Sequence, residues 1–401
     1  MRIQAALVLC VLALPACTRA PAPHAARRVV VAPPLPARVE PPVVRIWWTA
    51  GAREEQQPLA ELLARWNARH PDQPVRAEAA PSGPLPQALH AAQAAGHAPD
   101  LVISAAEPLV PVGDAADIQP LGAFATQQRL ARFLPQTLPQ LTEAGAVYGL
   151  PLSVKSLLLF YNKRLVPAPP TTWPQLLGQL RAANGPLLAL DLLHAPSLVP
   201  LLQGADGQNP RIDTPQAAAL LDTLRDLANR KILLLDADPA HVANEFGAGR
   251  LPMAVRGASF AASLPKDLAW GVAVLPEPLQ PLLHVDAVFL TRASAQPAAA
   301  LRVADYLASD EAALVRLQIG HLAPANQQTF AADAAGADPL PNVLRAQAQR
   351  SRPMPGSSDW MRLKSALEPM MAQVLAGKAP PAQALATAQR SLDAGRSEAK
   401  H

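Results

Sequence analysis

The stretch Val43-Val44-Arg45-Ile46-Trp47-Trp48 is a run of β-branched and aromatic residues, which is the composition of a buried β-strand. Beyond it the hydrophobic period changes repeatedly, indicating a helix at 59–69, a strand at 75–79, a helix at 85–95 and a strand at 99–103. This alternation predicts an open α/β sheet with parallel crossovers. Because ligands of such sheets bind beyond the carboxyl ends of the strands, the residues after positions 48 and 103 are candidate binding residues.

The rest of the chain continues the mixture of strands and helices. Strands are predicted at 148–154, 157–161, 187–190, 251–255, 270–274 and 285–290. Helices are predicted at 173–183, where Thr172 is the expected N-cap, and at 217–229, 241–246, 296–308, 310–318, 357–375 and 381–393. No internal repeat recurs at a fixed period.

The first 42 residues have the composition of an export signal followed by a tether. One charge at Arg2 precedes an apolar stretch from Ala5 to Leu14, which is too short to span a membrane. The stretch ends in Leu14-Pro15-Ala16-Cys17, which resembles a bacterial lipobox. We therefore predict a signal peptide at 1–16, lipidation of Cys17, and a disordered Pro/Ala-rich tether over 17–42. The anchored domain would lie on the periplasmic side of the cell envelope.

Length and charge narrow the function classes. The chain has 401 residues, half of them apolar, which is enough for two or three domains with a large core. Residues 1–42 hold five arginines and one acid, so residues 43–401 hold 30 basic and 30 acidic side chains. The neutral body gives no argument for nucleic-acid binding. The two cysteines, Cys10 and Cys17, exclude a disulfide framework, and the lack of an apolar run of 18 residues excludes a spanning helix.

Motifs of catalysis are missing from the sequence. It contains no G-x-S-x-G, no H-E-x-x-H and no phosphate loop. The nine histidines are scattered, with no pair at metal-ligand spacing. The sequence therefore predicts a protein that is not an enzyme and that has no metal and no cofactor.

Several segments resemble the bacterial extracellular solute-binding family that includes the maltose/maltodextrin-binding proteins. The most specific is Gly149-Leu150-Pro151-Leu152, followed by Leu159-Phe160-Tyr161-Asn162-Lys163 and then Pro169-Pro170-Thr171-Thr172-Trp173. Ala98-Pro99-Asp100-Leu101-Val102, the segment from Phe246 to Ala254 and the segment from Trp270 to Pro276 match further family patterns in the same order. The similarity covers nearly all of residues 43–395.

The resemblance implies an α/β, two-lobe periplasmic-binding-protein fold with a hinge and an interlobe cleft. Lobe one would comprise 43–153 plus 284–335, and lobe two 154–283 plus 340–401. Hinges would fall near 153–155, 283–286 and 332–340. Members of the family close on their ligand by hinge motion and then dock on an ABC permease.

The aromatic part of the implied ligand site rests on three side chains. Sugar rings stack on flat aromatic faces, so tryptophans are the first candidates. Trp48 stands nearer the strand end than Trp47, and only one of the two can point into a core. Trp360 lies where the family keeps a cleft tryptophan, and Phe260 lies near a second stacking position. The other three tryptophans are expected in the core, namely Trp66, Trp173 and Trp270.

The polar part departs from the maltose pattern. Glu107 retains a family acid, but Lys155 replaces a cleft glutamate and Lys364 replaces an arginine. Gly51 and Ala52 replace an acid and a base after the first strand. The resemblance therefore implies the family fold but does not imply a maltodextrin ligand. Each of the two lysines could instead be a solvated surface residue.

The expected function is a lipid-anchored, monomeric solute-binding component of an ABC importer that takes a small carbohydrate. Two cations in one cleft would instead suit another polar solute, such as a sugar phosphate or glycerol phosphate. A polyamine ligand and a sensor lipoprotein without a transport role also remain open.

Overall fold

The computed structural model describes residues 42–49, 53–106, 109, 117–202, 211–236, 238–320, 322–331 and 339–398. The chain separates into two units, 1–40 and 41–401, and all described residues belong to the second. The predicted signal peptide, Cys17, the tether up to Pro41, and Glu107 lie outside the described residues. None of the helices in the described part of the chain has both the length and the hydropathy to cross a bilayer.

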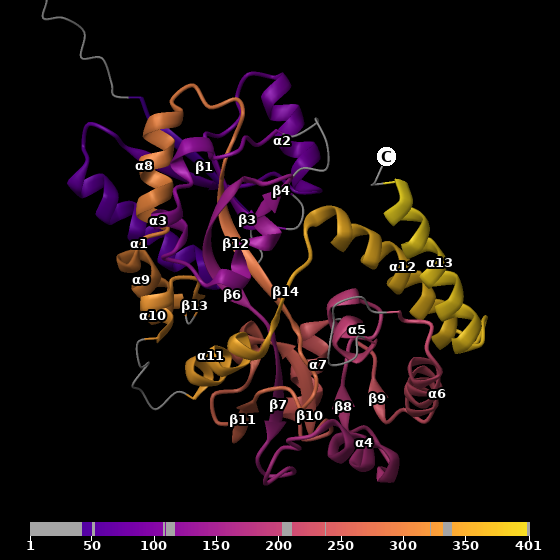
Figure 1. The fold of residues 1–401 in the computed structure, drawn as a ribbon. Coiled ribbons are helices and arrows are strands. Elements are labelled where there is room, and N and C mark those ends of the chain that lie inside the picture. The colour runs from indigo at the N-terminus through magenta and orange to yellow at the C-terminus, as the bar shows by residue number, and fades with distance from the viewer. Residues whose placement is uncertain are drawn as a thin grey trace, which may run out of the picture. The chain divides into compact units, whose positions relative to one another are not determined.

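The first sheet contains the strand that opens the sequence analysis. Its order is β13 (Ala323–Pro324), β6 (Gly149–Lys155), β12 (Leu282–Leu290), β3 (Leu101–Ala105), β1 (Val44–Trp48) and β2 (Val75–Ala79), and β14 (Arg352–Pro353) pairs with β12. Strands β1, β2 and β3 are parallel, as predicted, whereas β12 runs antiparallel to β3 and β6. The helices of this region are α1 (Arg53–Arg69), α2 (Leu85–Ala94), α3 (Gln127–Leu130), α8 (Pro297–Leu307), α9 (Asp310–Gly320) and α10 (Gln327–Ala331). Figure 1 shows α1, α8 and α9 gathered on one side of the sheet and α2 on the other.

The second sheet is built mainly from the middle of the chain. Its order is β11 (Trp270–Ala273), β7 (Leu157–Asn162), β10 (Met253–Gly257), β8 (Leu188–Ala189) and β9 (Leu233–Leu234). Strands β8, β9 and β10 are parallel, and β7 runs antiparallel to β10 and β11. Its helices are α4 (Trp173–Ala182), α5 (Ala195–Leu202), α6 (Pro215–Asn229), α7 (Pro239–Gly247), α11 (Leu340–Arg350), α12 (Ser357–Leu375) and α13 (Pro381–Glu398). Helix α4 begins at the predicted N-cap, where Thr172 and Gln175 form a capping box.

The chain passes between the two sheets at three places, which we call the crossover: residues 153–157, 274–286 and 350–356. Strand β6 ends at Lys155 in the first sheet and β7 begins at Leu157 in the second. Strand β11 precedes the return into β12, and β14 lies between α11 and α12. Strand β14 pairs with the first residues of β12 through Leu282 and Arg352, and both of these residues fall in the range predicted for lobe two. The predicted hinge at 332–340 lies almost entirely outside the described residues.

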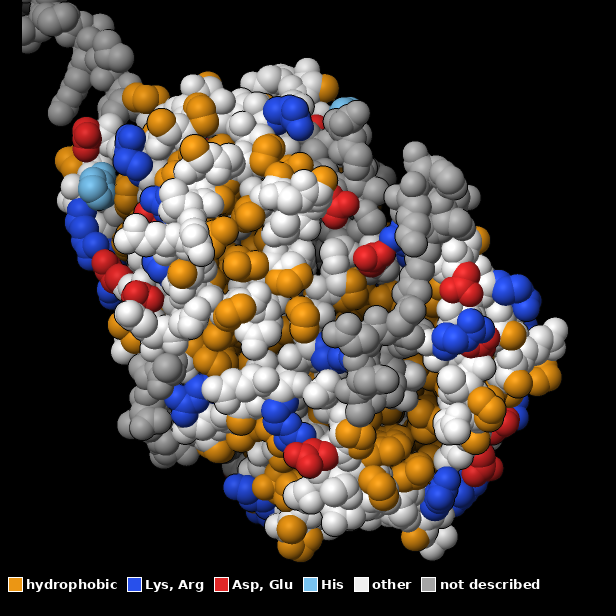
Figure 2. Space-filling view, in the orientation of Figure 1, with side chains coloured by type: hydrophobic (Ala, Val, Ile, Leu, Met, Phe, Trp, Pro, Cys, Tyr) orange, Lys and Arg blue, Asp and Glu red, His pale blue; other side chains and the backbone are white. Residues whose placement is uncertain are grey.

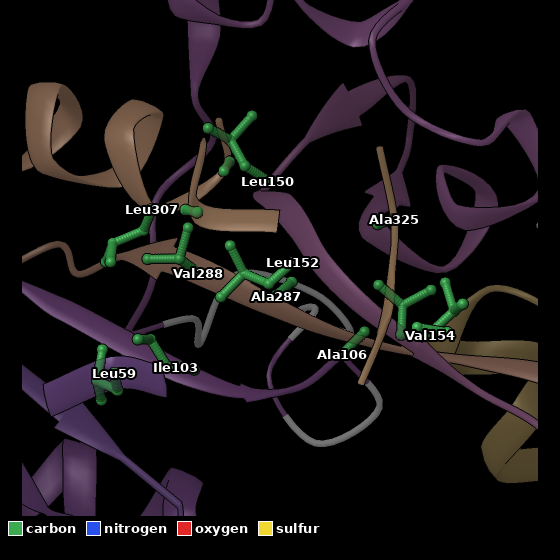
Figure 3. Packing of buried hydrophobic residues seen from close by; sticks show 14 of the residues in the cluster. Leu59, Ile103, Ala106, Leu150, Leu152, Val154, Ala287, Val288, Leu307 and Ala325 are labelled. Atoms are coloured by element: carbon green, nitrogen blue, oxygen red, sulfur yellow. The ribbon is translucent and has the colours of Figure 1, made fainter. Parts of the chain in front are cut away.

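Two apolar clusters form the interior. One surrounds the first sheet, where Leu59 of α1, Ile103 of β3 and Val288 of β12 are almost fully buried (Figure 3), and it continues onto the second sheet through Phe160 of β7 and Ala254 of β10. The other lies between the second sheet and α4, α5, α6, α12 and α13. Each fully buried leucine or isoleucine stabilises the fold by about 1.5–3 kcal/mol relative to exposure. The two clusters therefore fix both sheets, and with them the positions of the strand ends. On the face in Figure 2 basic and acidic side chains are interspersed, in keeping with a neutral body.

Candidate ligand-binding site

The carboxyl ends of the first sheet's parallel strands meet at the crossover. Trp48 at the end of β1 is in register with Ile103 of β3. Two residues further along β3, Ala105 is in register with Asp286 of β12, which in turn pairs with Ser153 of β6. The end of β3 thus abuts the two strands that leave the sheet for the second one. This is the edge at which open α/β sheets bind ligands.

In the second sheet, the carboxyl ends of the parallel strands also lie at the crossover. Gly257 at the end of β10 pairs with Leu157, the residue that follows the crossover residue Ser156. Ala254 of β10 is in register with Ala189 of β8, and Ala189 with Leu234 of β9. Both sheets therefore bring the ends of parallel strands to the region where the chain passes between them.

Trp48 lies at this edge with a half-buried side chain that packs against the first core. Its neighbour Trp47 is almost fully buried and donates its indole N–H to Glu78 over 2.8 Å. The two tryptophans therefore point to opposite faces of the sheet, as successive residues of a strand do, and Trp48 is the more accessible. Its role in ligand stacking remains a proposal.

Lys155 is engaged in an ion pair. Its Nζ lies 2.5 Å from Oδ2 of Asp286, whose side chain is about nine-tenths buried, and Ser153 Oγ lies 3.3 Å from the same oxygen. The charge that predicted an anionic ligand is thus balanced by a carboxylate of the first sheet. Lys364 is half-buried on α12, and its role stays a prediction.

Trp360 and Phe260 do not present free faces to a ligand, which corrects the stacking roles expected for them. Trp360 is 1% exposed, belongs to the core of the second sheet, and meets the ring of His284 edge-to-face at 6.4 Å between centroids. Phe260 is 4% exposed and lies edge-on to Phe160 and Phe246. The sequence places both residues near the site, but the packing of α12 and of the turn after β10 directs both rings inward.

A charged group that the sequence analysis did not identify stands at the ends of β8, β9 and β10. Asp191, Asp236 and Arg256 each follow the in-register residues Ala189, Leu234 and Ala254 by two positions. We call these three residues the strand-end cluster. In the sequence, each of the three is a charged residue at the end of a buried strand. This pattern indicates a cluster only when the register of the strands is known.

Carboxylates and imidazoles pair beside this cluster. His194 Nδ1 lies 2.7 Å from Asp191 Oδ2, and His241 Nδ1 is bonded to Asp236 Oδ2. The hydrogen bond to Asp236 raises the pKa of His241, and the same bond lowers the pKa of Asp236. Within the part of the chain that the structure describes, no three His, Cys, Asp or Glu residues are placed to hold a metal ion.

Two α/β sheets joined by repeated chain crossings, with the ends of parallel strands meeting at those crossings, define the class of two-lobe solute-binding proteins. Residues 50–314 match the family model of the bacterial extracellular solute-binding proteins. The chain belongs to that family. Its members bind solutes, so family membership confirms the prediction of a binding protein rather than an enzyme.

A relative and several solved structures show which proteins the chain is similar to. It is 30% identical to a maltotriose-binding protein of Pyrococcus abyssi (strain GE5 / Orsay) over 129 residues, which are 32% of this chain and only 28% of the relative. The GacH receptor of Streptomyces glaucescens GLA.O, solved unliganded and with acarbose, superposes with a TM-score of 0.75 at 17% identity, covering 88% of this chain and 98% of the receptor. The maltose/maltodextrin-binding domain MalE of Bdellovibrio bacteriovorus, bound to maltotriose, gives 0.72 at 20% identity, covering 88% and 99%. These structures confirm the predicted α/β two-lobe fold.

Proposed function

We propose that the protein binds a neutral carbohydrate of the maltodextrin type at the crossover and delivers it to an ABC permease. The observation that carries the proposal is the register, which brings the strand ends of both sheets to one place. A ligand there would touch both sheets at once and so favour a closed arrangement of the two. The sugars named for the relative and for the solved structures supply the ligand class.

The ion pair of Lys155 favours a neutral ligand over an anionic one. A lysine whose charge is already met by a buried carboxylate gains less from a phosphate, because the phosphate would also face Asp286. This contact weakens the main argument for a sugar phosphate or glycerol phosphate. Hydroxyl groups, by contrast, can use both the donors of a lysine and the acceptors of a carboxylate.

Calorimetry of the purified exported domain with maltose, maltotriose and maltotetraose tests the proposed ligand class. We expect binding of at least one of them, and a loss of more than tenfold in affinity in Trp48→Ala. Trp48→Phe is the matched control, because it keeps an aromatic face and should retain most of the affinity. Absence of binding for all three sugars would contradict the proposal, and sugar phosphates and polyamines in the same panel would then identify the other ligand classes.

The lipid anchor is a separate part of the proposal and rests on the sequence Leu14-Pro15-Ala16-Cys17. Only a cysteine thiol can form the thioether to a diacylglyceryl group. We expect Cys17→Ser to move the protein from the membrane to the soluble exported fraction. Cys10→Ser is the control, since it changes the other cysteine of the leader and should leave the protein on the membrane. An unacylated wild-type protein in mass spectrometry would rule the anchor out.

A further inference from the structure

The strand-end cluster gathers three charges at one level of the second sheet. Asp191, Asp236 and Arg256 follow in-register positions of neighbouring strands by the same number of residues. The order β10-β8-β9 places Asp191 on the strand between the other two. All three stand at the edge that pairs with the crossover through Gly257. The cluster therefore occupies the place where a ligand of the second sheet would lie.

Both aspartates of the cluster are held in fixed positions by matching bonds. Asp191 accepts the main-chain N–H of Leu193 at 3.2 Å on one oxygen and contacts His194 with the other. Asp236 accepts the N–H of Asp238 at 2.7 Å on one oxygen and contacts His241 with the other. Because each carboxylate oxygen already has a partner, the aspartates supply fixed negative charge beside Arg256.

The side chain of Arg256 extends across the sheet, and some of its N–H donors have no protein acceptor among the described residues. It donates through Nη2 to the main-chain oxygen of Asp236 and through Nη1 to that of Val255 at 3.0 Å. To meet Asp236 its side chain must pass over the end of β8, which lies between β10 and β9. A guanidinium has five N–H donors, so these two bonds leave three. Among the described residues, no carboxylate forms an ion pair with Arg256. Its three guanidinium nitrogens are also absent from the described side-chain atoms that are fully buried without a hydrogen-bond partner.

The carboxylates of Asp191 and Asp236 act on the charge of Arg256 without forming an ion pair with it. Burial lowers the pKa of Arg256, and the negative charges of Asp191 and Asp236 oppose that effect. An arginine guanidinium is effectively always protonated in proteins, so Arg256 carries a positive charge. Its planar donors are thus half-buried near two carboxylates, whose negative charge offsets its own.

We propose that Arg256 anchors the ligand on the second sheet by donating its remaining N–H groups to hydroxyl or ring oxygens of a neutral sugar. The proposal rests on the proposed function and deepens it, because it names the residue and the ligand chemistry. Donors set in a planar fork fit two neighbouring sugar oxygens at once. The two fixed aspartates disfavour the same sugar carrying a phosphate.

Affinity for maltotriose in three variants tests the assignment. We expect Arg256→Ala to bind at least tenfold more weakly and Arg256→Lys to fall between it and the wild type. Arg250→Ala is the matched control, because Arg250 precedes the same strand but is exposed and bonded to Glu245 at 2.6 and 2.9 Å. Its affinity should stay within twofold of the wild type. Equal affinity in folded Arg256→Ala and wild type would overturn the assignment.

A measurement on the wild-type protein covers the case in which Arg256→Ala does not fold. Phenylglyoxal modifies accessible arginines, and mass spectrometry reads each site. We expect saturating maltotriose to slow the modification of Arg256 several-fold and to leave that of Arg250 unchanged. Equal modification of Arg256 with and without bound sugar would overturn the assignment while leaving the proposed function intact.

Two further binding results distinguish a wrong ligand class from a wrong function. A wild-type protein that binds no maltooligosaccharide overturns the proposed function, and with it the anchoring role that rests on that function. A wild-type protein that binds maltose 1-phosphate more tightly than maltose contradicts the neutral ligand class. Tighter binding of the unphosphorylated sugar is the expected result.

Discussion

Trp360 illustrates how the surroundings of one residue decide its role. The indole is 1% exposed, and its Nε1 has no hydrogen-bond partner. Leaving a buried donor unpaired costs about 1–3 kcal/mol, which the packing of the ring must offset. The ring contributes to the core of the second sheet together with Leu367 and Met371 on the same helix. Its importance is therefore structural in this conformation.

Truncation of this indole should destabilise the fold more than it alters the ligand site. We expect Trp360→Ala to lower the free energy of unfolding by about 3–5 kcal/mol, because a large buried ring leaves a cavity. Trp360→Phe should cost less than about 2 kcal/mol, since it keeps a ring and removes the unpaired donor. Urea unfolding followed by circular dichroism measures both. Unchanged stability together with weakened sugar binding would restore Trp360 to the ligand site.

His241 reports on the fixed geometry of Asp236. The hydrogen bond between them raises the pKa of His241, so its imidazole should titrate above the ordinary histidine range in an NMR titration. Asp236→Asn should bring that pKa down, whereas Asp226→Asn on α6 should leave it unchanged. The stabilisation from the pair is present below the ordinary imidazole pKa and is lost as pH rises through the raised one. A His241 pKa that does not respond to Asp236→Asn would contradict the contact.

At the scale of elements, three short segments are tied together by buried side chains at the crossover. Ser156 Oγ lies 2.8 Å from Ser351 Oγ, and Ser351 also donates to the main-chain oxygen of Gln347 over 2.8 Å. Gln347 Oε1 in turn accepts the N–H of Leu275 at 2.6 Å. These bonds connect one residue from each pass between the sheets, so the crossover is a hydrogen-bonded unit.

Removing Gln347 should weaken this unit. Gln347→Leu leaves the buried N–H of Leu275 without its acceptor, so we expect the free energy of unfolding to fall by about 1–3 kcal/mol. Gln383→Leu on α13 is the control, because that side chain is exposed and the same change there should have an effect below about 0.5 kcal/mol. Thermal and urea unfolding give the comparison. A Gln347→Leu protein as stable as the control would show that the bond contributes nothing.

The elements that the sequence predicted correctly are those with a clear period. The parallel strands β1, β2 and β3 and the capped helix α4 fall where their patterns indicated. Helix α1 begins at Arg53 rather than at 59, because Pro58 inside it resembles a stop signal. Helix α5 was not predicted, since it is buried nearly all round and contains Pro200, so it shows neither an apolar stripe nor an unbroken run.

The candidate site was predictable only in part for a related reason. The strand pattern placed Trp48 near a strand end, the family resemblance placed Lys155 near the first hinge, and the structure puts both at the crossover edge. The ion-pair partner of Lys155 is Asp286, which lies 131 positions away, so no local sequence pattern predicts the pair. The strand-end cluster likewise depends on the pairing of three distant strands. Contacts that arise from register cannot be read from a single segment.

At the scale of the whole molecule, the two sheets and their crossover account for binding without a catalytic centre. The body of the chain is neutral, and the cations we find at the crossover and in the strand-end cluster lie beside carboxylates. A neutral sugar held between the two sheets would draw them together, because it gains contacts on both sides only in the closed arrangement. We therefore expect the two sheets to close on the ligand.

Small-angle X-ray scattering with and without maltotriose tests that claim most directly. Calorimetry first fixes the sugar concentration at which the exported domain is saturated. We predict a smaller radius of gyration at saturation, and a smaller decrease for Arg256→Ala at the same sugar concentration, because less of that variant is liganded. An identical scattering profile for the free and the saturated wild-type protein would contradict ligand-driven closure.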